Sequence, residues 1–201
     1  MAYHGYIPLI HQVAGTFEKP KILEIGVWTG ITTFSLASRL SRSHESFSYT
    51  GVDILIRDDV KETLKYMGVN NDNIRLYEQN SLKFLEDCSE VFDIVLIDGD
   101  HNYYTVKNEL RHLEKITHKD SFVVIDDYHG KWSKRDLFYS ERDEYSNVDE
   151  ATKRIDCGKE GVRPAVDEFL SEKKHWSGFS LIQGEPIVLC KKESRFLQSN
   201  A

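Results

Sequence analysis

Two stretches of the sequence pass from apolar residues directly into side chains that can do chemistry. In DIVLIDGDHNY the apolar run ends at Asp98, and Asp100 and His101 follow it closely. In SFVVIDDYHG a similar run ends at Asp126 and Asp127. Open α/β sheets bind their ligands at the carboxyl ends of the strands. The carboxylates and the imidazole therefore indicate a functional site at one edge of a sheet.

The elements that would position these residues alternate along the chain. Residues 58–67 and 103–116 repeat apolar side chains with the period of a helix. The short apolar stretches around them are expected to form strands, and they lie at residues 21–26, 48–54, 74–78, 92–98 and 121–127. Strands that alternate with helices predict a parallel sheet with right-handed crossover connections.

The C-terminal part departs from this alternation. Residues 161–172, GVRPAVDEFLSE, predict a helix, and residues 178–192 predict two strands joined through Gly184. Such a hairpin makes one strand antiparallel to its neighbours. Before it, the segment 128–160 has no convincing apolar periodicity, and half of residues 131–160 are charged. We expect a segment of this length to be a lid, a substrate-binding loop or disordered.

Composition is that of one soluble globular domain spanning residues 1–201, with 40% hydrophobic and 29% charged residues.

Residues 1–18 are expected to form a helical segment with Pro8 in its first turn, which could serve in a homo-oligomer. The net charge of -7, with scattered basic residues, argues against a nucleic-acid partner. Short apolar runs exclude a membrane partner and a secretion signal, and three cysteines without CxxC spacing suggest reduced thiols in a cytoplasmic protein.

A glycine-containing turn follows the first expected strand in LEIGVWTGITTF, where Gly26 and Gly30 let the backbone turn sharply and approach a ligand. It is not a dinucleotide fingerprint, because Trp28 and Ile31 occupy the second and third glycine positions. It is not a phosphate-binding P-loop either, since Gly-Lys-Ser/Thr is missing. A generic strand–turn–helix with Thr29 as the helix N-cap remains the alternative.

Together with Asp53 at the end of the second strand, this turn resembles the S-adenosylmethionine loop of class I methyltransferases. The resemblance runs from Lys21 to Lys191. It implies a Rossmann-like, doubly wound α/β fold with helices on both faces of a seven-stranded sheet. The implied strand order is 3-2-1-4-5-7-6, with strand 7 antiparallel. More narrowly, IDGDH, the Asp-Asp pair and GVRPAVDEF resemble the metal-dependent O-methyltransferase branch that includes the macrocin and aminocoumarin sugar methyltransferases.

This resemblance implies that S-adenosylmethionine is bound along the edge of the sheet. Asp53 is suited to accept both ribose hydroxyls. Asn80 and Ser81 match the positions that contact adenine, although either could simply cap the following helix. The expected cofactor-binding residues are Glu24, Gly26, Thr29, Gly30, Asp53, Asn80, Ser81 and Asp98.

The family's magnesium ligands fall on Asp98, Asp126 and Asp127 in this chain. Carboxylates that end neighbouring strands can converge on one ion, because such strands lie about 4.8 Å apart. Magnesium prefers oxygen ligands, and it would orient the acceptor and lower the pKa of its hydroxyl. The alternative is that these residues are helix caps and solvated loop acids.

Two residues are candidates for the catalytic base. His101 ranks slightly above Asp100 because its ordinary pKa suits proton removal near neutrality, while Asp100 could instead cap a helix. His129 is a third candidate, a substrate contact or simply an exposed loop residue.

The sequence thus predicts an O-methyltransferase that uses S-adenosylmethionine and Mg²⁺. Its acceptor would be a small hydroxylated molecule: a sugar, a glycosylated natural product or a catechol-like diol. The competing hypotheses are a metal-independent methyltransferase, a non-catalytic cofactor-binding partner subunit and a nicotinamide dehydrogenase.

Overall fold

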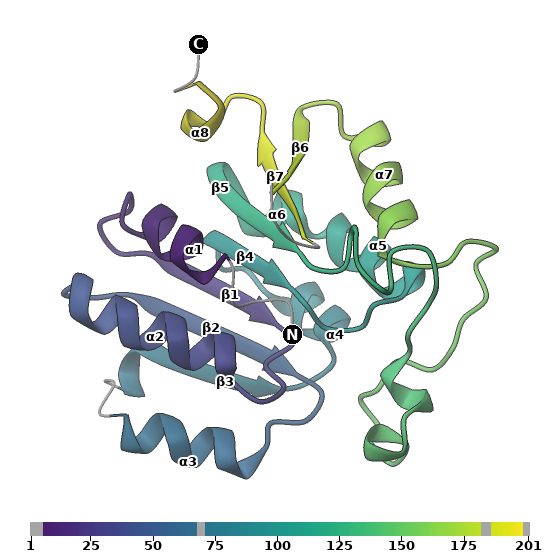
Figure 1. Ribbon diagram of the computed structural model, residues 1–201, viewed down its shortest axis with the longest axis horizontal. Helices are drawn as coiled ribbons and strands as arrows, with labels where there is room; N and C mark the ends of the chain where they lie inside the picture. The colour runs from purple at the N-terminus through teal and green to yellow at the C-terminus, as the bar shows by residue number, and fades with distance from the viewer. Residues whose placement is uncertain (1–5, 68–70, 182–185, 199–201) are drawn as a thin grey trace.

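The computed structural model describes residues 6–67, 71–181 and 186–198. Within these ranges the strands form one sheet of seven, in the order β3-β2-β1-β4-β5-β7-β6 (Figure 1). β7 is antiparallel to β5 and β6, whereas the remaining neighbours are parallel. The predicted fold class and strand order are confirmed. The strands are β1 (Lys21–Ile25), β2 (Ser48–Asp53), β3 (Ile74–Glu78), β4 (Phe92–Ile97), β5 (Thr117–Ile125), β6 (Trp176–Ser180) and β7 (Ile187–Lys191).

Helices cover both faces of the sheet (Figure 1). One face packs against α4, α5, α6 and α7, and the other against α1, α2 and α8. Successive side chains of β4 point to opposite faces of the sheet. Ile94 and Leu96 pack in the core cluster on the side of α1 and α2, and Val95 and Ile97 pack in the cluster on the side of α4 to α7. The helices are α1 (Ile7–Ala14), α2 (Ile31–Ser43), α3 (Asp58–Tyr66), α4 (Ser81–Asp87), α5 (Tyr103–Arg111), α6 (Leu113–Ile116), α7 (Val162–Glu172) and α8 (Arg195–Gln198).

Some element boundaries differ from those expected. β5 begins at Thr117 rather than at residue 121, and it ends at Ile125, so the two aspartates after it belong to a turn. The helix expected over residues 103–116 is divided at His112, whose N–H bonds to the Glu109 carbonyl three residues earlier. The turn expected at Gly184 lies outside the described residues.

The expected N-terminal helix is present as α1, with proline in its first turn. Its apolar face is part of the chain's own core, because Ile7, Ile10 and Val13 pack in the same cluster as α2 and the sheet. No helix among the described residues is long and apolar enough to cross a membrane.

The charged segment between β5 and α7 packs against the carboxyl edge of the sheet. It forms two short 3₁₀ turns, Tyr139–Glu141 and Asp143–Tyr145, and extends to one side of the sheet in Figure 1. Leu137 pairs with His101 in an isolated antiparallel bridge, and Phe138 is fully buried. Of the roles that the sequence left open, this packing favours a lid or binding loop over disorder.

The packing of α1 gives a stability test. Replacing Ile10 by alanine removes a fully buried side chain, so the free energy of unfolding should fall by about 2–5 kcal/mol. The exposed neighbour Gln12, replaced by alanine, is the control and should change stability by less than about 0.5 kcal/mol. Urea unfolding measures both, and equal losses would contradict the packing of α1 on the core.

Candidate active site

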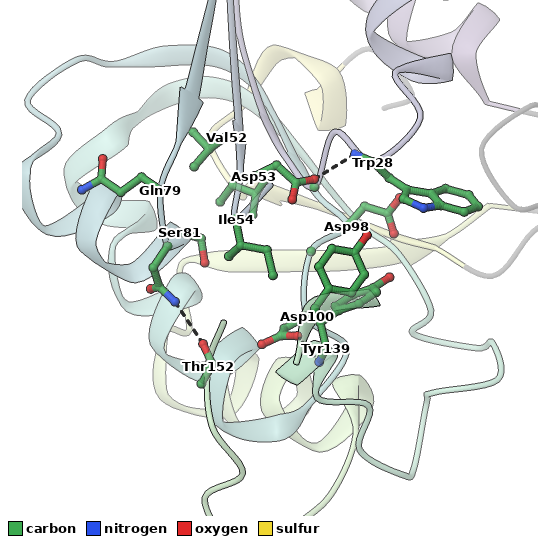
Figure 2. A pocket seen from close by; sticks show the side chains of 15 residues that line it. Trp28, Val52, Asp53, Ile54, Gln79, Ser81, Asp98, Asp100, Tyr139 and Thr152 are labelled. Carbon is green, nitrogen blue, oxygen red and sulfur yellow. Dashed lines mark hydrogen bonds between the residues drawn. The ribbon is translucent and has the colours of Figure 1, made fainter. Parts of the chain in front are cut away.

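A pocket opens at the carboxyl edge of the sheet, where β1, β2, β3 and β4 end. The turn after β1 forms one wall, and the segment after β5 closes the opposite side (Figure 2). Its lining includes Gly26, Trp28, Asp53, Ile54, Gln79, Asn80, Ser81, Asp98, Gly99, Asp100, Tyr139, Tyr145 and Thr152. Half of the expected site residues line this pocket, namely Gly26, Asp53, Asn80, Ser81, Asp98 and Asp100.

The turn after β1 is shaped by glycine. Gly26 has a φ of +92°, and a Cβ there would lie 2.0 Å from the Asp98 carbonyl oxygen. Only glycine lets the two strand ends approach this closely. Trp28 also has a positive φ, of 44°, and its indole stands at the rim of the pocket, 57% exposed. Backbone strain in a bulky residue beside a pocket is typical of functional sites.

Asp53 holds this turn in place. Its Oδ2 accepts hydrogen bonds from the N–H groups of Trp28 (Figure 2) and Val27, each at 2.8 Å, and its Oδ1 accepts one from Leu55 at 3.2 Å. Burial raises the pKa of Asp53 above its ordinary value, although these donors oppose the shift. The carboxylate lines the pocket.

Glu24, Thr29 and Gly30 do not line the pocket. Glu24 lies beneath the turn, only 2% exposed, and accepts hydrogen bonds from Thr33 Oγ1 at 2.5 Å and Tyr49 OH at 2.8 Å. Burial raises its pKa to about 8. Thr29 does not cap α2, because Gly30 occupies the N-cap position. These residues act on the shape of the turn rather than on the pocket surface.

Asn80 and Ser81 lie on the pocket wall at the start of α4. Asn80 caps the helix by accepting a hydrogen bond from the N–H of Leu82 at 3.0 Å, which confirms the capping role that the sequence left open, and it also lines the pocket. Its amide also donates to Thr152 Oγ1 at 3.1 Å, which ties the pocket wall to the segment after β5. Ser81 donates to the buried Glu109 at 2.6 Å.

Sequence reasoning missed the pocket residues of the segment after β5. Tyr139 and Tyr145 line the opening, with their rings in an edge-to-face contact at 5.0 Å. The Tyr139 N–H donates to Asp100 Oδ1 at 3.0 Å, which fixes the segment over the pocket. The segment has no apolar periodicity, and only its cluster of aromatic residues could have suggested this contact.

A group of potential metal ligands borders the pocket. One ligand atom from each of Asp98, His101 and Asp126 lies within 4.8 Å of the others. Asp127, expected as a ligand, is not in this group. Its φ of +57° carries its Oδ2 to the far side of the imidazole, 3.4 Å from His101 Nδ1, and its Oδ1 accepts from the Trp132 N–H at 3.4 Å.

His101 is held between two carboxylates. Its Nε2 is 3.5 Å from Asp98 Oδ1, and Asp127 lies on its Nδ1 side. Burial lowers the pKa of His101 to about 4 and raises that of Asp100 to about 6. Asp100 lines the pocket, whereas His101 does not. His129 is exposed, and it lies beside Ser180 rather than at this group.

Comparison with known proteins identifies the fold family. Residues 23–128, just over half of the chain, match the family described as "Methyltransferase domain". The chain belongs to this methyltransferase family. It has the Rossmann-like class I fold of the methyltransferases that use S-adenosylmethionine.

Individual relatives agree with this assignment. The chain is 29% identical over 143 residues to the uncharacterized protein R132 of Acanthamoeba polyphaga mimivirus, a match spanning 65% of this chain and 63% of that protein. Among solved structures, it is similar to the O-methyltransferase TomG of Streptomyces achromogenes, involved in tomaymycin synthesis and solved with S-adenosylmethionine. That match has a TM-score of 0.61 and 17% identity, and covers 94% and 80% of the two chains.

The S-adenosylhomocysteine-bound methyltransferase PaMTH1 of Podospora anserina gives a TM-score of 0.64 at 16% identity, over 96% of this chain and 80% of that one. These distant likenesses concern the fold. The roles of individual residues in this methyltransferase rest on its own geometry.

The close approach at Gly26 can be tested in the methyltransferase. Gly26→Ala should lower the free energy of unfolding by about 3 kcal/mol or more, because it adds a steric clash to an unfavourable φ. Gly158 has a φ of +68° with nothing within 4 Å of an added Cβ, so Gly158→Ala should cost only about 1–2 kcal/mol. Denaturant unfolding of the two variants separates the cost of the unfavourable φ from the cost of the steric clash. Equal losses in the free energy of unfolding would contradict the close approach at Gly26.

The buried Glu24 predicts a pH dependence of stability. Its folded pKa, about 8, lies above the ordinary value of 4.5, so the folded state keeps a proton that the unfolded state releases. Stability should therefore fall as pH rises from about 5 to 8 and level off above. Glu24→Gln, which cannot ionise, should flatten this slope by up to about 1.4 kcal/mol per pH unit. Unfolding curves at several pH values provide the measurement, and an unchanged slope would contradict the buried, protonated carboxyl.

Proposed function

We propose that this methyltransferase transfers a methyl group from S-adenosylmethionine to an oxygen of a small hydroxylated acceptor, with a divalent metal ion at the site. The observation that carries the proposal is the convergence of Asp98, His101 and Asp126 beside the pocket formed by the glycine turn. TomG, a structural neighbour, is itself an O-methyltransferase.

The pocket suits a nucleoside cofactor. Asp53 presents a carboxylate where β2 ends, and Gln79, Asn80 and Ser81 offer polar groups where β3 ends. The absence of a side chain at Gly26 lets its backbone lie directly against that of Asp98 at the pocket wall. S-adenosylmethionine bound here would supply the methyl group. The protein's part is to hold the cofactor with its sulfonium end toward Asp98.

The three potential ligands suit a divalent ion. Two carboxylates supply the hard oxygen donors that Mg²⁺ prefers, and a neutral imidazole also suits Mn²⁺ or Zn²⁺. Burial keeps His101 neutral near pH 7, so a ring nitrogen is available as a donor. An ion bound here would lower the pKa of the acceptor hydroxyl and fix its orientation. Asp127, on the other side of the imidazole, would orient the ring.

This arrangement favours Asp100 as the group that removes the proton. Asp100 lines the pocket, whereas His101 is turned toward Asp98 and Asp127. We therefore assign proton removal to Asp100 and metal ligation to His101, which reverses the order favoured from the sequence. A metal-independent reaction with His101 as base is the second candidate, favoured by the two carboxylates that flank the ring.

The residues proposed to surround the methyl acceptor enclose it and take no part in the chemical step. Trp28 stands at the rim, and Tyr139 and Tyr145 extend the opening with aromatic surface. Such surfaces favour a small ring-bearing acceptor such as a sugar or a diol. Enclosure positions the acceptor for in-line attack, and positioning alone is worth on the order of 7–11 kcal/mol in favourable cases.

The proposal is tested by calorimetric titration with S-adenosylhomocysteine and, separately, with Mg²⁺ and Mn²⁺. Asp126→Asn should weaken metal binding by about tenfold or more while leaving S-adenosylhomocysteine affinity near that of the wild type. Asp127→Asn is the matched control, with the same chemical change one residue away and outside the ligand group. It should weaken metal binding less.

The alternatives give different outcomes. Undiminished turnover in EDTA would favour the metal-independent reaction. Binding of NADH without S-adenosylhomocysteine would favour a dehydrogenase. Cofactor binding with a biological effect that survives both Asp98→Ala and Asp126→Ala would favour a non-catalytic subunit.

A further inference from the structure

A second groove lies next to the active site, on the turn that follows β5 and the first turn of α7. Its lining is dominated by cationic side chains and comprises His129, Gly130, Lys131, Ser133, Lys134, Arg135 and Arg163. None of these lining residues is acidic, although the chain as a whole has a net charge of -7. The groove is therefore a local concentration of positive charge on an acidic protein.

The backbone fixes the two walls of this groove against each other. The N–H groups of Val162 and Arg163 donate to the carbonyls of Trp132 and Ser133, at 3.1 and 2.9 Å. Gly161 makes this approach possible, because a Cβ there would lie 2.6 Å from the Ser133 oxygen. The start of α7 and the basic turn are thus held as one surface.

The cationic side chains are oriented by aromatic rings instead of acids. Lys131 and Arg135 both lie over the ring of Trp132, at 4.5 and 4.8 Å from its centroid. In the part of the chain that the structure describes, no carboxylate lies within ion-pair distance of Lys131, Lys134 or Arg135. Arg163 has one such neighbour, Asp167, at 3.6 Å. Cations arranged in this way keep their capacity to bind an anion.

The groove is joined to the proposed metal site through Asp127. Gly130 N–H donates to the Asp127 carbonyl at 3.1 Å, and Trp132 N–H reaches its carboxylate at 3.4 Å. The other oxygen of that carboxylate faces His101. The basic turn therefore begins at a residue that borders the reacting centre.

We propose that this groove binds a phosphoryl group carried by the methyl acceptor, so that the acceptor is a phosphorylated hydroxy compound such as a sugar phosphate. Lysine ammonium and arginine guanidinium groups match the negative charge and the acceptor oxygens of a phosphate. The assignment to the acceptor rests on the proposed function, whereas phosphate binding by the groove does not.

The test measures binding of inorganic phosphate to the full chain in the presence of EDTA, so that no metal contributes. Lys134→Gln/Arg135→Gln should weaken phosphate binding by about tenfold or more, because it removes two charged donors. Lys65→Gln/Lys174→Gln is the matched control, with the same loss of charge at two exposed lysines elsewhere. The control should bind phosphate as the wild type does.

A second experiment compares the binding of glucose 6-phosphate with that of glucose. A third titrates S-adenosylhomocysteine into the wild type, the groove variant and the control variant.

Tighter binding of the phosphorylated sugar, lost only in the groove variant, supports the inference. Equal phosphate binding in the groove variant and the control would overturn it, as would no saturable binding to the wild type. Loss of phosphate binding with S-adenosylhomocysteine affinity retained separates the groove from the cofactor pocket. If phosphate binds at the groove but S-adenosylhomocysteine binds none of the proteins, the proposed function fails while the groove stands.

Discussion

The site depends on backbone hydrogen bonds at the carboxyl ends of β1, β4 and β5. These bonds extend the pairing of the parallel strands by one residue beyond each strand end. Gly26 N–H donates to the Val52 carbonyl, and Asp98 N–H donates to that of Ile25, both at 2.8 Å. Asp126 N–H donates to the Ile97 carbonyl at 3.0 Å in the same manner. Each bond holds the first residue after a strand in register with its neighbour. The distances between the site residues at these strand ends are therefore set by the spacing of the strands in the sheet. Flexible loops contribute less to their placement.

This arrangement requires carboxyl groups where the protein interior disfavours their charge. Glu24 lies under the glycine turn, and Glu109 lies under Ser81, and burial raises the pKa of each to about 8. Glu109 accepts a short hydrogen bond from Ser81 on the pocket wall, and Glu24 accepts one from Thr33 in the first turn of α2, behind the pocket. Polar groups beneath a ligand pocket fix its shape at some cost in stability, because the ionised forms are poorly solvated.

The sequence predicted those parts of the fold that depend on local pattern. Apolar runs located the strands, and the strand ends brought Asp98 and Asp126 together as expected. The left-handed backbone of Asp127 could not be foreseen, since aspartate adopts it only where the surrounding turn requires it. The basic groove was equally hidden, because Arg163 is remote in sequence from the lysines and joins them only when α7 packs on the turn. Tyr139 reaches the pocket through backbone bonding, which leaves no periodic signal.

The segment after β5 is fastened to the pocket wall by groups that also border the ligand space. Glu150 accepts from the Asn80 N–H at 2.9 Å and pairs with Lys83 at 2.7 Å, near the surface. These contacts hold the segment against this side of the pocket. Ions in solution weaken exposed pairs of this kind. We therefore expect higher ionic strength to loosen the attachment of this segment to the pocket wall.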